Sequence, residues 1–133
     1  HYKGFQVAPS LEKLKEVYQN QYPELIEWGI HVMVSQNGLG ELTIGDSHEY
    51  GLDLSPFDRE DVNRMILDFL KSFAQFKDWR IGSAWHGIYP KMTNGATEFI
   101  HQVSPQVWIV NGMGGAGMTL SFGLGEEVVE KIS

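Results

Sequence analysis

The spacing of apolar residues along the chain predicts three α-helices. The first opens at residues 9–10 and is limited by Pro23. The second follows residues 55–58 (Ser-Pro-Phe-Asp), which we expect to cap it, and its apolar positions recur at intervals of three and four. These positions are Val62, Met65, Ile66, Phe69, Leu70 and Phe73. The third helix runs from about residue 119 to residue 131 and is expected to pack through its apolar positions, Leu120, Leu124, Val128 and Ile132.

Alternation of apolar and polar residues predicts β-strands between these helices. The expected strands are residues 29–35, 41–50, 79–89, 98–103 and 107–110. Asn37-Gly38 is typical of a β-hairpin turn and joins the first two strands. The order of elements predicts an α+β fold with a mostly antiparallel sheet and flanking helices.

A glycine-rich segment lies between the last expected strand and the last expected helix. Gly112, Gly114 and Gly117 fit the pattern G-x-G-x-x-G. Only 16 residues follow Gly117, whereas a dinucleotide-binding βαβ unit needs ~30, so the pattern does not predict a Rossmann site. Backbone N–H groups and the positive end of a helix dipole still face this turn. We therefore expect something electron-rich to approach it closely.

Charge and composition narrow the range of partners. The formal net charge is −7 and the basic residues are scattered, so we expect no nucleic-acid partner. No apolar stretch reaches the roughly 18 residues of a membrane span, so we expect no membrane partner. The chain has no cysteine, which fits a reducing compartment, and we expect a cytoplasmic location. The five histidines lack the spacing of metal-binding motifs, so we expect no metal.

Three motifs carry a resemblance to a known family. Residues 85–90 read Trp-His-Gly-Ile-Tyr-Pro, residues 107–112 read Val-Trp-Ile-Val-Asn-Gly, and residues 114–121 read Gly-Gly-Ala-Gly-Met-Thr-Leu-Ser. Together they resemble the C-terminal part of the D-amino-acid-oxidase-like FAD-dependent oxidoreductases, which include glycine oxidase and sarcosine oxidase. Residues 29–76, with Ile-Gly-Asp-Ser at 44–47, look like the substrate domain of that family. The resemblance covers nearly the whole chain.

The resemblance implies that the chain is the last third or so of a flavoenzyme, without its N-terminal dinucleotide-binding domain. Residues 1–90 would be the substrate-domain portion. Residues 91–133 would be the strands, glycine turn and helix that return to the FAD domain. We expect this piece alone to be inactive, because the AMP half of FAD needs the missing domain. Apolar surface exposed at the cut would allow the fragment to form a homodimer.

The resemblance also implies a cofactor site and a reaction. Backbone N–H groups of the glycine turn would contact the pyrimidine side of the flavin ring and stabilise the anionic reduced form. The implied residues are Gly114, Gly115, Ala116, Gly117, Met118 and Thr119. The implied activity is oxidation of a C–N bond in a small amine or amino-acid-like substrate, by hydride transfer to flavin N5.

Departures from the family pattern concern the substrate and the cofactor linkage. Many relatives place an Arg before the Pro of the first motif, to hold the substrate carboxylate, whereas this chain has Tyr89. Relatives with covalent flavin use a Cys where Gly87 stands, and a Lys where Thr119 stands. We therefore expect non-covalent FAD and a substrate other than a simple α-amino acid, such as a phosphonate- or amine-bearing compound. Lys91 or Arg80 would supply the positive charge instead.

Three side chains are the candidates for catalysis. The hydroxyl of Tyr89 would line the substrate pocket, although Tyr89 is equally well explained as a strand aromatic in the core. His31 and His48 lie on the predicted hairpin, and in relatives this sheet covers the flavin. An imidazole there could take a proton from the amine or orient the substrate. His86 is better explained as a packed or surface histidine.

Two other functions fit the sequence. The chain could be a free-standing α+β binding or oligomerisation module that has no catalysis of its own. It could also bind nucleotide phosphates through residues 112–117, which would require tight binding of ATP or NAD by the isolated chain.

Overall fold

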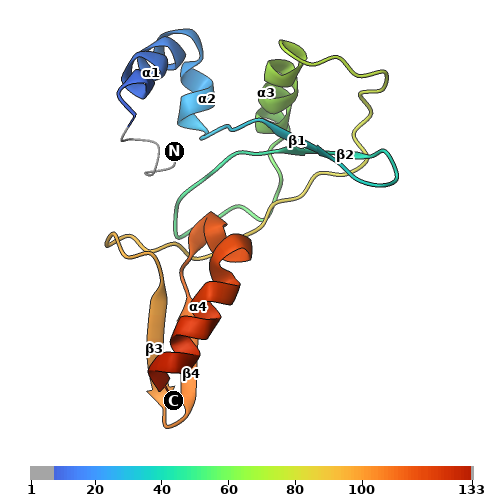
Figure 1. Ribbon diagram of the computed structural model, residues 1–133. Coiled ribbons are helices and arrows are strands. Elements are labelled where there is room, and N and C mark those ends of the chain that lie inside the picture. The colour runs from blue at the N-terminus through green and yellow to red at the C-terminus, as the bar shows by residue number, and fades with distance from the viewer. Residues whose placement is uncertain (1–7, 133) are drawn as a thin grey trace. The chain divides into compact units, whose positions relative to one another are not determined.

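The chain has an α+β fold, as the sequence predicts. A computed structural model describes residues 8–132, which contain helices and two antiparallel β-hairpins (Figure 1). The antiparallel pairing is confirmed, but the described strands form two separate two-stranded sheets. The chain divides into a first compact unit that ends at Ala84 and a second that begins at Trp85.

Two of the three helices described in the first unit match the predicted pattern, and the short helix between them was not predicted. Helix α1 spans Ser10–Gln21 and ends before Pro23, which occupies the first turn of the short helix α2, Pro23–Glu27. Proline is favoured there because its missing N–H group has no partner in a first turn. Helix α3 spans Glu60–Lys71 and has the strongest apolar stripe. The prediction of this helix from its spacing is therefore confirmed.

The core of the first unit is small and centres on α3. Val62, Ile66 and Leu70 are buried, and Leu70 is fully enclosed. Leu25 of α2 is the other buried apolar residue in the described part of this unit. Phe73 was expected in the same stripe, but it lies beyond the end of α3 and is 62% exposed.

Aromatic rings connect α1 to α3. The ring of Phe69 lies 6.2 Å from that of Tyr18 and 5.3 Å from that of Tyr22, both in edge-to-face geometry. Such pairs add roughly 0.5–1.5 kcal/mol beyond the burial of their area. These contacts hold the otherwise exposed helix α1, which has no buried residue.

The predicted cap of α3 is wrong. The helix begins at Glu60 with Arg59 as its N-cap residue, and no side chain caps it. The Ser55 hydroxyl instead accepts a hydrogen bond from the Phe57 N–H at 3.1 Å, which forms a local turn before the helix. Arg59 pairs with Asp61 and its guanidinium lies 3.9 Å from the Trp28 ring centroid. The N-terminus of α3 is thus stabilised by Arg59 packed on the Trp28 ring. The sequence predicts a cap from residues 55–58 instead.

The predicted hairpin of the first unit is confirmed, with shorter strands. Strand β1, Met33–Gln36, pairs with β2, Leu42–Gly45, in antiparallel register. The connection between the two strands spans five residues, and the Asn37 side chain stabilises it. Its side-chain oxygen accepts hydrogen bonds from the N–H groups of Leu39 at 2.9 Å and Glu41 at 3.0 Å. The residue with positive φ is Gly40 (φ 82°), while Gly38 has ordinary φ.

Asn37→Ala is expected to destabilise the first unit by about 1 kcal/mol, since it removes two side-chain acceptors from exposed backbone N–H groups. Urea unfolding would measure the loss. Gly38→Ala serves as the control, because a Cβ there meets nothing within 4 Å. Equal stability of the two variants would contradict the role assigned to Asn37.

The predicted strand at residues 79–89 is wrong. Residues 79–90 adopt no regular secondary structure, and nearly all of them are exposed. A strand needs a hydrogen-bonded neighbour, and β1 and β2 pair only with each other. The alternation of apolar and polar residues at 79–89 does not show whether a neighbouring strand is present. The boundary between the two units falls within this segment.

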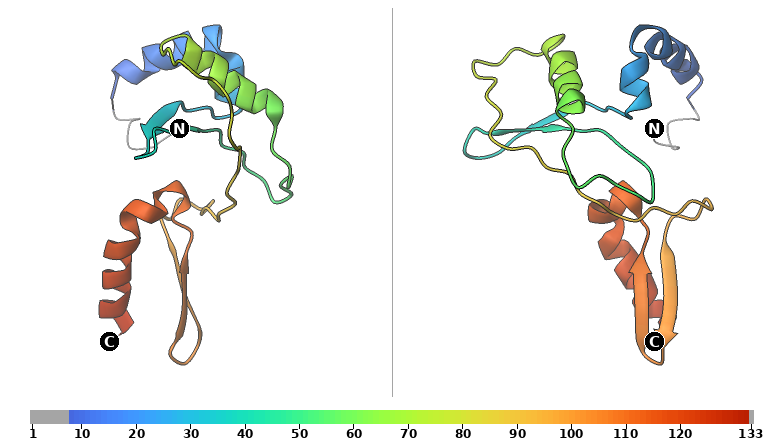
Figure 2. Two further views of the ribbon diagram at one scale, coloured as in Figure 1. Left: turned by 90° about the vertical axis from the view of Figure 1, so that its right-hand side faces the viewer. Right: turned by 180° about the vertical axis from the view of Figure 1, so that it is seen from behind.

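The second unit consists of a hairpin, a glycine turn and a long helix. Strands β3, Phe99–Ser104, and β4, Val107–Asn111, lie where the sequence predicts two strands. They pair antiparallel, with a bulge near Ser104. A short 3-10 turn η2, Gly114–Ala116, leads into α4, Gly117–Ile132. Figure 2 shows α4 extending in the same general direction as the hairpin.

The expected packing of α4 is confirmed at only one of its four predicted positions. Val128 is buried, at 5% exposure. Leu120 and Ile132, expected on the same packed face, are about half exposed. The helix also begins two residues earlier than the pattern indicates, at Gly117, because the glycine turn itself continues into helical backbone.

Candidate functional site: the glycine turn and the histidine hairpin

The glycine turn connects β4 directly to the N-terminus of α4. Gly112 (φ 84°) and Gly114 (φ 58°) have left-handed backbone, a conformation that glycine adopts without steric cost. The Ala116 N–H donates to the Met113 carbonyl at 3.3 Å, which closes η2. The strand–turn–helix order thus points the first N–H groups of a 16-residue helix at the turn.

The glycines of the turn differ in what surrounds them. Gly112 is buried, and a Cβ placed there would lie 3.0 Å from the Met92 sulfur and 3.2 Å from the Phe99 nitrogen. A Cβ at Gly117 would meet nothing within 4 Å. Gly112 is therefore required by the packing of the protein itself, whereas Gly117 leaves open space at the start of α4.

Tyr89 and Lys91 lie against the same turn. A Cβ at Gly115 would be 3.5 Å from the Tyr89 hydroxyl, and a Cβ at Gly114 would be 3.5 Å from Lys91 Cγ. An isolated antiparallel bridge between Lys91 and Met113 fixes this neighbourhood. The structure therefore brings one candidate catalytic residue, Tyr89, to the candidate cofactor residues. The alternative of a strand aromatic in the core does not fit, because Tyr89 is outside any strand and 48% exposed.

His31 and His48 come together around an aspartate that the sequence analysis did not select. Asp46 Oδ1 lies 3.7 Å from His31 Nδ1, and Asp46 Oδ2 lies 3.8 Å from His48 Nε2. The backbones of His31 and Asp46 exchange two hydrogen bonds, of 2.9 and 2.7 Å. This group, which we call the His31–Asp46–His48 cluster, can hold or transfer a proton. No local sequence pattern indicates Asp46, because its contact with His31 depends on the pairing of the hairpin.

Arg80, one of the two candidate cations, is already paired. Its guanidinium donates to Asp78 Oδ2 through Nε at 2.7 Å and Nη2 at 2.5 Å. These side-chain hydrogen bonds lower the pKa of the Asp78 carboxyl and raise the pKa of Arg80. The charge of Arg80 is thus compensated within its own loop.

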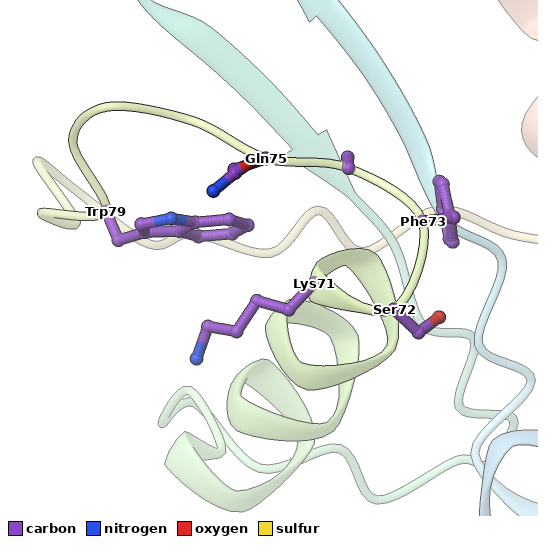
Figure 3. Close-up of a pocket in the computed structure, with 6 residues that line it drawn as sticks. Lys71, Ser72, Phe73, Gln75 and Trp79 are labelled. Carbon is purple, nitrogen blue, oxygen red and sulfur yellow. The ribbon is translucent and has the colours of Figure 1, made fainter.

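An open hollow lies at the C-terminal end of α3 (Figure 3). Its volume is about 450 Å³. Its lining residues are Lys71, Ser72, Phe73, Ala74, Gln75 and Trp79. The Lys71 ammonium is 5.5 Å from the Trp79 ring centroid. None of the candidate site residues lines this hollow.

Residues 8–132 offer neither a metal site nor a membrane-spanning helix. No group of three or more His, Asp or Glu side chains in this range is placed to hold a metal ion. None of its helices combines the length and apolar character needed to cross a membrane.

These features define an α+β protein with a strand–glycine turn–helix segment suited to an electron-rich ligand. The family model described as FAD dependent oxidoreductase matches residues 4–131. The chain belongs to this family, as its motifs indicate. Neither the comparison with curated proteins nor that with solved structures gives a match.

The glycine turn fits the flavin of this family. A planar ring can approach the backbone closely only where no side chain covers the backbone. Gly117 leaves such a place, because a Cβ there would have no neighbouring side chain within 4 Å. Gly115 is exposed, and the only atom within 4 Å of a Cβ there is the Tyr89 hydroxyl, a polar group. The N–H groups at the start of α4 favour negative charge at this position.

Proposed function

We propose that this chain supplies the flavin-ring contacts and substrate-facing side chains of an FAD-dependent oxidoreductase that oxidises a C–N bond in a small amine or amino-acid-like compound. The family match over residues 4–131 carries the FAD-dependent part of this proposal. The C–N bond as the target rests on the resemblance of the motifs to amine-oxidising relatives. FAD, when bound, supplies the acceptor for a hydride from the carbon beside the amine.

The glycine turn is assigned to hold the flavin ring. Backbone N–H groups of residues 115–119 would donate to the pyrimidine side of the ring, where negative charge develops during the reaction. Donors fixed in advance at such a position stabilise the transition state without reorganisation. We propose non-covalent binding, since the chain has no cysteine to form a thioether link.

Two groups of side chains are assigned to binding the substrate and removing its proton. The Tyr89 hydroxyl, beside Gly115, would hydrogen-bond the substrate at the turn. The His31–Asp46–His48 cluster would accept the proton from the substrate ammonium, because hydride loss requires the neutral amine. Asp46 supports this role by its position, since its two carboxylate oxygens lie 3.7 Å from His31 Nδ1 and 3.8 Å from His48 Nε2.

The adenosine diphosphate half of FAD needs a second binding unit. The strands described in residues 8–132 pair only antiparallel, so this range contains no parallel βαβ unit of the dinucleotide-binding kind. We propose that a dinucleotide-binding domain outside this sequence completes the cofactor site, and that the chain alone is inactive. Residues 1–90 would then belong to the substrate domain and residues 91–133 to the part that contacts the flavin.

Anaerobic mixing of the FAD-loaded full-length protein with a panel of small molecules tests the proposal. Primary and secondary amines should bleach the oxidised flavin, and their hydroxyl analogues should not. Heat or acid precipitation should release intact FAD into the supernatant. Bleaching by 2-hydroxy acids but not by amines would contradict C–N oxidation, and flavin remaining on the pellet would contradict non-covalent binding.

A further inference from the structure

Asparagine is followed by glycine at three places in the chain, residues 37–38, 94–95 and 111–112. Such a pair can lose the side-chain amide without an enzyme, because glycine has no Cβ to hinder attack by its own backbone nitrogen. That nitrogen displaces ammonia from the asparagine Cγ, and water then opens the succinimide ring that has formed. The three pairs have the same sequence, so the fold decides which of them can react.

Two of the three pairs are restrained by the fold. The Asn37 side chain accepts hydrogen bonds from two backbone N–H groups through Oδ1, and its Nδ2 donates to Glu41 Oε2 at 2.7 Å. Asn111 is the last residue of β4, in register with Phe99, and its Oδ1 accepts a hydrogen bond from the Gly112 N–H at 2.8 Å. Gly112 is also buried. Its nitrogen is therefore shielded from the base that must remove its proton before it can attack.

The Asn94-Gly95 pair is open to this reaction. Both residues are exposed and lie in the irregular loop before β3. In the part of the chain that the structure describes, the Asn94 side chain makes one hydrogen bond, in which its Oδ1 accepts from the Ala96 N–H at 3.0 Å. An Asx turn of this kind folds the side chain back toward the peptide group that follows it. A Cβ at Gly95 would meet nothing within 4 Å, so a succinimide ring has room to form there.

We propose that Asn94 is the deamidation site of this protein and that isoaspartate is the main product. The bond between Cγ and the amide nitrogen of Asn94 breaks, a bond from Cγ to the Gly95 nitrogen forms, and ammonia leaves. Water then opens the ring at the backbone carbonyl. The product carries the backbone through the side chain, which lengthens the loop and adds a negative charge. Met92 and Phe99, on either side of this loop, both pack against Gly112. Deamidation would therefore loosen the packing behind the glycine turn.

Mass spectrometry of the aged full-length protein tests this proposal. The protein would be incubated at mildly alkaline pH, either folded or in urea, and then cleaved after glutamate, which places the three pairs in separate peptides. In the folded protein we expect Asn94 to deamidate about tenfold faster or more than Asn37, because the hydrogen bonds that hold the Asn37 amide must first break. In urea the three rates should become similar, since all three pairs have the same sequence.

Asn94→Gln is the matched control, because glutamine forms the corresponding larger ring far more slowly. This variant should lose the fast mass gain in the peptide that contains residue 94 and leave the other two peptides unchanged. Methylation by an isoaspartyl-specific methyltransferase should be stronger in the aged wild type than in the aged variant. Deamidation of Asn37 or Asn111 as fast as that of Asn94 in the folded protein would overturn the proposal. So would an Asn94 that reacts in urea but not in the folded protein, and a mass gain without methylation would contradict isoaspartate as the product.

Discussion

Replacing Gly117 by valine is expected to remove most of the bound FAD while leaving the protein folded. Gly117 has helical backbone (φ −53°), and a Cβ there meets no atom of the chain within 4 Å. A valine side chain therefore has room in the protein alone. It would occupy the space assigned to the flavin ring, and overpacking of this kind costs roughly 1–3 kcal/mol, which corresponds to a loss of affinity of about 5- to 150-fold.

The FAD-to-protein ratio after gel filtration, together with the thermal unfolding midpoint of the FAD-free protein, measures this effect. Gly123→Val is the matched control, because Gly123 lies on the same helix and also faces open space. We expect the control to keep its FAD. Equal FAD content in the two variants would place the flavin elsewhere.

Gly112→Ala is expected to destabilise the second unit by about 2–5 kcal/mol. The left-handed backbone at φ 84° costs a residue with a Cβ roughly 1–2 kcal/mol. The added carbon would also lie 3.0 Å from the Met92 sulfur and 3.2 Å from the Phe99 nitrogen. The backbone atom cannot move without disturbing the β3–β4 pairing, and such overpacking adds roughly 1–3 kcal/mol.

Chemical denaturation of Gly112→Ala and Gly95→Ala separates the two contributions. Gly95 has nearly the same φ (88°), but a Cβ there meets nothing within 4 Å. Gly95→Ala should therefore lose only about 1–2 kcal/mol. If both variants lose the same stability, crowding at Gly112 is not the reason for its glycine.

Local sequence patterns predicted the elements whose stability depends on their own residues. The spacing of Val62, Ile66 and Leu70 identified α3 because that stripe is the buried face of the helix. Asn37 identified the hairpin because its side chain holds the turn. The glycine pattern between β4 and α4 located the turn correctly, although it did not predict which glycine is buried.

Features that depend on distant partners could not be predicted. Residues 79–89 alternate like a strand, but no neighbouring strand pairs with them in the structure. Asp46 became a candidate only once the hairpin register placed it opposite His31. The position of the Tyr89 hydroxyl, 3.5 Å from where a Cβ of residue 115 would lie, joins residues 26 apart in sequence and follows from no local pattern. The sequence identifies residue types with suitable chemistry, but it does not show which residues lie next to one another in the fold.

The most direct test of the central claim is nuclear magnetic resonance of the full-length protein loaded with FAD labelled with ¹³C at C2 of the flavin. The account predicts that Gly117→Ala shifts the C2 resonance, because the turn contacts the pyrimidine side of the ring, and leaves the ³¹P resonances of the pyrophosphate unchanged. A shift of the ³¹P resonances with an unchanged C2 resonance would show that the turn binds phosphates, and would contradict the proposed placement of the flavin.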